Sequence, residues 1–87
     1  MRLASILDLG AAKPLWSELC AARRQPLEID ASAVERLGGL CLQVLLAAKT
    51  AWAADGVAFQ IADPSAAFLE AIRLMAADEL VAREAAS

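Results

Sequence analysis

The longest apolar run of the chain, residues 40 to about 54, most constrains the fold. At 100° per residue its side chains form one apolar stripe of Cys41, Val44, Leu45, Ala48 and Trp52. The opposite stripe is small or polar and consists of Gln43, Ala47, Thr50 and Ala54. Asp55 and Gly56 then end the run. The pattern predicts a helix that lays one stripe on a sheet.

Three leucines of this helix give apolar area beyond what one sheet face needs: Leu40, Leu42 and Leu46. Exposed apolar area with a polar rim marks an interface, whereas an all-round apolar helix is often simply buried. Two interpretations therefore stay open, a partner that covers these leucines or other parts of the same chain.

Short segments with a period of two predict strands on either side of this helix. In "LEID", Leu27 and Ile29 share a face. In "VAFQIA", residues 57–62, apolar side chains alternate with Ala58 and Gln60. The amino-terminal "RLASIL" alternates more weakly and predicts an edge strand or two short pieces.

Two further helices are predicted from spacing and end signals. Residues 11–22 follow the capping candidates Asp8 and Gly10, end at "ARRQP", and carry the stripe Ala12, Leu15, Trp16, Leu19 and Cys20. Residues 64–75 follow Asp63 as the cap, with Phe68, Ile72 and Met75 as the core stripe and Leu69 beside it. The segment "AADELVAREAAS" predicts one or two more helical turns. Strands and helices thus alternate, which is typical of an α/β fold with right-handed crossovers, and residues 1–87 are enough for one domain.

Charge and composition exclude several classes of function. The net charge of −3 argues against binding to a nucleic-acid backbone, and the chain has no histidine to act as a general base or metal ligand. Cys20 and Cys41 lie in neither a CxxC nor a metal-ligand spacing and are expected to be small buried residues. No segment reads as a signal peptide or membrane span, so we expect a cytoplasmic protein without direct membrane insertion.

Residues that could suggest an enzyme have simpler interpretations. Gly38 and Gly39 precede a helix, but no phosphate-binding motif or lysine accompanies them, and a tight turn explains them better. Asp30, Ser32 and Glu35 form a polar cluster without a nucleophile and base, so side-chain bonding to turn amides is favoured. We expect no catalytic residue, cofactor or metal site.

The order of these motifs resembles the STAS domain, shared by anti-sigma factor antagonists and the cytoplasmic tails of sulphate transporters. Asp30, Ser32 and Val34 match the family's strand end, Gly56 matches the glycine before the next strand, and "ADPSAAFLEAIRLM" resembles its closing element. The resemblance covers residues 27–75. It implies a mixed sheet of about four strands, with three to four helices packed mainly on one side.

The same resemblance implies a binding function without the usual phosphorylation switch. Gly39 falls where the family places its phosphorylatable serine or threonine, and glycine has no hydroxyl. The implied partner-binding residues are Glu35, Arg36, Leu37, Gly38, Gly39, Leu40, Gln43 and Ala47. The implied partner is a kinase of the anti-sigma or histidine-kinase type. The alternatives are a transport complex for lipids or anions, in which an ATPase would be the partner, and a self-associating module that forms a homodimer.

Overall fold

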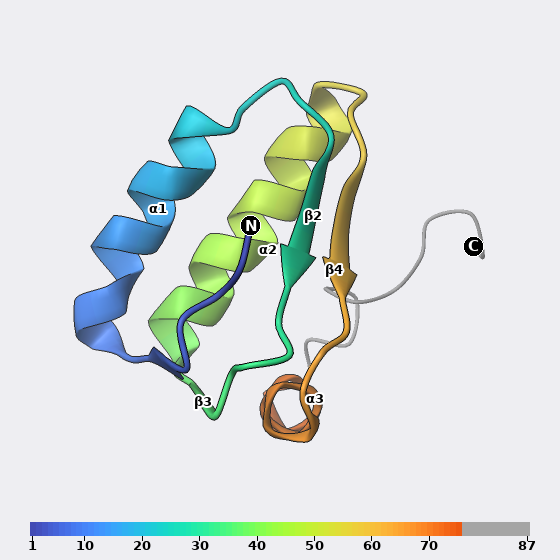
Figure 1. The fold of residues 1–87 in the computed structure, drawn as a ribbon. Helices are drawn as coiled ribbons and strands as arrows, with labels where there is room; N and C mark the ends of the chain where they lie inside the picture. Colours follow the sequence, from blue (N-terminus) through green and yellow to red (C-terminus); the bar gives the residue numbers. More distant parts are fainter. Residues whose placement is uncertain (76–87) are drawn as a thin grey trace.

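The computed structural model describes residues 1–75 as a small α/β fold (Figure 1). Its elements follow in the order β1 (Ile6–Leu7), the 3-10 helix η1 (Leu9–Ala11), α1 (Ala12–Ala21), β2 (Leu27–Asp30), β3 (Arg36–Leu37), α2 (Gly39–Ala54), β4 (Phe59–Ala62) and α3 (Ala66–Leu74). The α/β class is confirmed, and the three predicted helices lie within two residues of their expected bounds. The helical turns predicted for residues 76–87 lie outside the described residues.

The strands pair in parallel throughout the described part of the chain. β1 pairs with β3, with Leu7 opposite Leu37, and β2 pairs with β4, with Ile29 opposite Ile61. An isolated parallel bridge between Arg2 and Asp30 joins the two pairs. The amino-terminal segment therefore lies between β3 and β2, and the strand order across the layer is β3, β1, β2, β4.

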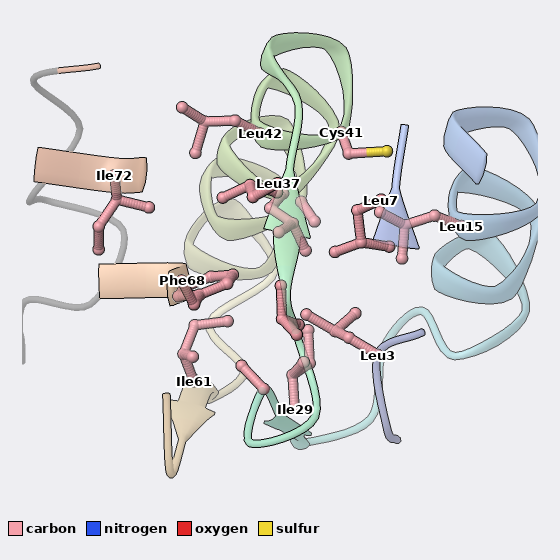
Figure 2. Close-up of a cluster of buried hydrophobic side chains, with 14 of the residues drawn as sticks. Leu3, Leu7, Leu15, Ile29, Leu37, Cys41, Leu42, Ile61, Phe68 and Ile72 are labelled. Carbon is pink, nitrogen blue, oxygen red and sulfur yellow. The ribbon is translucent and has the colours of Figure 1, made fainter. Parts of the chain in front are cut away.

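Helices α1 and α2 lie together on one side of this layer, and α3 crosses the end where β2 and β4 finish (Figure 1). The core between them is wholly apolar, since no polar or charged residue is buried among the described residues. Figure 2 shows side chains from the strands and all three helices meeting there. The core includes Leu3, Leu7, Leu15, Leu19, Ile29, Val34, Leu37, Cys41, Leu45, Trp52, Ile61, Phe68 and Ile72.

Helix α1 buries a narrower stripe than its sequence predicts. Leu15 and Leu19 are in the core, as expected, whereas Trp16 is 48% exposed and Cys20 is also exposed. The prediction of two buried cysteines is therefore wrong for Cys20 and confirmed for Cys41. The helix packs chiefly on α2, and such a contact needs only a strip one or two residues wide.

The three surplus leucines of α2 have different environments. Leu42 is buried in the core, and Figure 2 shows it on the side of α2 toward Ile72 of α3. Leu46 is partly buried, whereas Leu40 is 49% exposed. Other parts of the chain therefore cover Leu42, and Leu40 alone of the three is exposed on the surface.

Helix α3 begins two residues later than the sequence suggests. Ser65, and not Asp63, is the N-cap, and its hydroxyl accepts a hydrogen bond from the Phe68 amide at 3.0 Å. Asp63 has a φ of 48°, a left-handed conformation that aspartate tolerates better than most residues. Phe68 and Ile72 are buried as predicted, while Met75 is exposed. The helix therefore rests on two large side chains one turn apart.

Candidate docking surface

The junction of β3 and α2 brings the predicted partner-binding residues to one end of the molecule. The Gly38 amide donates to the carbonyl oxygen of Leu7 at 2.8 Å, and the Gly38 carbonyl oxygen accepts the Leu42 amide at 3.1 Å. Strand β1 and the first turn of α2 are thus both hydrogen-bonded to Gly38. A β-carbon on Gly38 would lie 3.1 Å from the Leu7 oxygen, which is tighter than usual. Glycine at this position permits the close approach.

Gly39 has a different environment from Gly38. No atom would lie within 4 Å of a β-carbon placed on Gly39, and the residue is exposed. The position that resembles a family phosphorylation site therefore faces open space. Neither packing nor backbone conformation requires a glycine there.

Most of the predicted surface is accessible. Glu35, Arg36, Leu40, Gln43 and Ala47 are exposed, and the last three follow one face of α2. Leu37 is the exception, since it is only 7% exposed and belongs to the core. Its side chain packs inward beneath this surface, while Arg36, the other residue of β3, is exposed.

Leu9 enlarges this surface, although the sequence analysis did not single it out. It is 77% exposed and lies in η1, which contacts α2. The Cys41 thiol donates to the carbonyl oxygen of Asp8 at 3.3 Å and so fixes η1 beside the first turn of α2. The sequence signal that could have indicated Leu9 is its position directly before Gly10, outside the apolar stripe of the following helix. We use "docking surface" for the exposed residues Leu9, Glu35, Arg36, Gly39, Leu40, Gln43 and Ala47 together with the partly buried Gly38.

An open groove of about 470 Å³ continues from this surface toward α3. Glu35, Arg36 and Leu37 line one side, and the other side is formed by Ala66, Ala67, Glu70, Ala71 and Leu74. The alanines keep the α3 wall low and leave the groove shallow. The sequence analysis missed this second wall because no local pattern places α3 beside residues 36–37.

The polar cluster before the docking surface is a turn. The Ser32 amide donates to a carboxylate oxygen of Asp30 at 2.8 Å. Hydrogen bonds from the Ser32 side chain and then from its backbone lower the pKa of Asp30 below its ordinary value. The carboxylate thus stays ionised and bound to the turn, which is the interpretation favoured from the sequence.

The Cys41 thiol is held in its protonated form. Burial, and secondarily the charge of Asp8, raises the pKa of Cys41, so the reactive thiolate is disfavoured. Within residues 1–75 no three or more Cys, Asp or Glu side chains gather in a way that could hold a metal ion. What the arrangement offers chemically is a contact surface of leucine, glycine and a few charges.

Comparisons with known proteins give one result that bears on this surface. A protein-family model described as "Mlab, STAS domain" matches residues 1–82. Searches of curated proteins and of solved structures gave no match. No helix in the described part of the chain is long and apolar enough to cross a membrane.

Proposed function

Because the chain belongs to the STAS domain family, we propose that it is a non-catalytic regulatory module that binds a protein partner through the docking surface. The observation that carries this proposal is the exposure of Leu9 and Leu40 beside two glycines and Arg36. An apolar patch with a charged rim is typical of a protein interface. We further propose that the protein works in the cytoplasm.

The proposed partner is a kinase of the anti-sigma or histidine-kinase type, bound without a phosphorylation switch. Residues 36–42 contain no serine, threonine or tyrosine, so phosphorylation within this segment would not release the partner. The contact would then be governed by the amounts of the two proteins.

The same observation favours a second candidate, the subunit of a lipid or anion transport complex. A surface without a switch suits a permanent contact with a transport ATPase as well as it suits a kinase. The two candidates share the docking surface and differ in the partner that occupies it.

Affinity purification tests the docking surface. The protein, tagged at its carboxyl end, is purified from its native cells beside Leu40→Asp and Leu69→Asp. Leu69 is a matched control because it is 42% exposed on α3, outside the docking surface and the groove. We expect one partner to be retained by the native protein and by Leu69→Asp but lost by Leu40→Asp. Equal retention by all three proteins would refute the surface.

The identity of that partner decides between the two candidates. Recovery of a soluble kinase supports the first, and recovery of an ATPase from a membrane fraction supports the second. If a kinase is recovered, Gly39→Ser adds a hydroxyl where the structure has open space. We expect the kinase to label Gly39→Ser with phosphate from ATP and to leave the native residues 36–42 unlabelled. Labelling of the native segment would contradict the missing switch.

A further inference from the structure

The outer edge of β4 is a second, unassigned surface of the molecule. β4 pairs with β2 and with no other described strand, and Figure 1 shows it at the end of the sheet layer away from α1. The opposite edge of the layer is different, since β3 has only two residues and α3 contacts it. Within residues 1–75, β4 is thus the longer and less covered of the two edges.

Backbone geometry shows which groups of β4 face outward. The Leu27 amide donates to the carbonyl oxygen of Ala58 at 2.9 Å, and the Ala31 amide donates to that of Ala62 at 3.1 Å. In a parallel ladder every second residue turns its backbone groups to the neighbouring strand. The groups of Gln60 therefore face β2, and the amide and carbonyl groups of Phe59 and Ile61 face away from it.

This edge lacks the features that usually protect a strand from pairing. Residues 57–62 contain no charge, proline or glycine. Natural edge strands commonly carry a lysine, a proline or a bulge that blocks further pairing. The side chains of Phe59 and Ile61 point into the protein, so the outward backbone groups are not shielded by bulky residues of their own strand.

We propose that this edge pairs with the same edge of a second copy of the chain, in an antiparallel arrangement across a two-fold axis at Gln60. Phe59 then lies opposite Ile61 of the second copy and exchanges two backbone hydrogen bonds with it. By symmetry, Ile61 lies opposite Phe59 of the second copy and exchanges two more backbone hydrogen bonds with it. The outward amide and carbonyl groups of both residues are then hydrogen-bonded in both copies. The two sheets join into one, with the helices of both copies on the same face.

Side chains and charge agree with this register. Gln60 is exposed on the open face, and its two copies become direct neighbours that can bond amide to amide. Glu28 is the partner of Gln60 within one copy. The two Glu28 carboxylates would be three strand spacings apart, about 14 Å. Salt screens charges beyond about 8 Å at physiological ionic strength, so their repulsion is small.

Charge variants at Gln60 test the pairing. Sedimentation equilibrium across a concentration series measures dimer formation by the native protein, Gln60→Lys, Gln60→Glu and an equal mixture of the two variants. We expect the native chain to dimerise and each variant alone to weaken the dimer about fivefold, since like charges lie directly opposite each other. The mixture should regain the native affinity, because opposite charges then face each other. Leu40→Asp should dimerise like the native protein.

Hydrogen exchange supplies a residue-level readout that does not depend on a variant. The amides of Phe59 and Ile61 should exchange fast at low concentration and slowly where the dimer forms, while the Gln60 amide stays protected in both. Four results would overturn the proposal: a monomer at every concentration, a dimer insensitive to charge at Gln60, a dimer lost in Leu40→Asp, and Phe59 and Ile61 amides protected already in the monomer. Partner capture by the docking surface is measured in a separate purification experiment, so the two proposals fail separately.

Discussion

The adjacent glycines at the start of α2 have opposite requirements. A β-carbon on Gly38 meets the Leu7 carbonyl oxygen at 3.1 Å, whereas one on Gly39 meets nothing. Gly39→Ala should raise the free energy of unfolding by about 0.5 kcal/mol, because alanine loses less backbone entropy on folding. Gly38→Ala should lower it by about 1 kcal/mol, since β1 must shift. Urea unfolding of both variants checks this, and equal effects of the same sign would contradict the assigned environments.

The two cysteines should differ in reactivity. Cys20 is exposed, whereas Cys41 is buried and burial raises the pKa of its thiol. Iodoacetamide at neutral pH should therefore label Cys20 in the native protein and should label Cys41 only after unfolding. Mass spectrometry of proteolytic fragments reads out both sites. Rapid labelling of native Cys41 would mean that η1 separates readily from α2.

Asp30 should make stability depend on acid. Its pKa is lowered in the folded protein by Ser32, so the folded state binds that proton more weakly than the unfolded state. The contribution is present above the ordinary pKa of the carboxyl group and is lost as the pH falls through the folded value. Asp30→Asn should therefore be less stable than the native protein at pH 7 and equal to it in strong acid. A stability difference that is independent of pH would contradict this.

At the scale of elements, Ser65 joins α3 to the segment before β3. Its hydroxyl accepts the Phe68 amide at 3.0 Å and donates to the Val34 carbonyl oxygen at 2.6 Å, and its own amide donates to the Ala31 carbonyl oxygen. Ser65→Ala removes the first two bonds and should lower the free energy of unfolding by about 2 kcal/mol. Thermal unfolding measures the loss. Ser32→Ala, at an exposed turn, is the control and should have a smaller effect.

The elements that could be predicted from the sequence are those long enough to show a repeating pattern of apolar residues. Helix α2 and β2 have enough apolar positions to fix both type and face, and their predictions are confirmed. β3 has only Arg36 and Leu37, too short for any alternation, and the structure creates it by pairing with β1. The prediction of which α1 residues are buried was wrong in part for a related reason. Spacing alone cannot show that Leu15 is covered while Trp16 stays exposed.

The docking surface was predictable only in part. Gln43 and Ala47 follow from helical spacing, which places them opposite the core stripe, and both are exposed. The spacing left open whether Leu40 is covered, and the structure leaves its side chain 49% exposed. Leu9 and the α3 wall of the groove come from tertiary packing, which no local pattern contains. The binding role of these residues remains a proposal.

At the scale of the whole molecule, Trp52 connects parts that are far apart in sequence. Its indole N–H donates to the Gln25 carbonyl oxygen at 2.8 Å, and its ring lies 5.6 Å from that of Phe59. Arg23 lies over the ring at 5.7 Å and also bonds Asp55 at 2.9 Å. The indole thus links α2 to the connection between α1 and β2 and to β4.

Trp52→Phe should keep most of this packing and lose the hydrogen bond. We expect the free energy of unfolding to fall by about 2 kcal/mol, because the Gln25 carbonyl group loses its donor and a small void remains. Chemical denaturation followed by circular dichroism measures the change. Trp16→Phe is the matched control, since Trp16 is half exposed on α1, and it should change stability by less than about 0.5 kcal/mol.

The central place of the amino-terminal segment has a consequence for the order of folding during synthesis. The Met1 carbonyl oxygen accepts the Asp30 amide at 2.7 Å, and Leu7 pairs with Leu37, so this segment needs partners made some thirty residues later. Translation at about 5–20 residues per second leaves it unpaired for seconds. Distant pairings of this kind also slow folding. Apolar residues such as Leu3 and Leu7 therefore stay unburied on the nascent chain until β2 and β3 have been made.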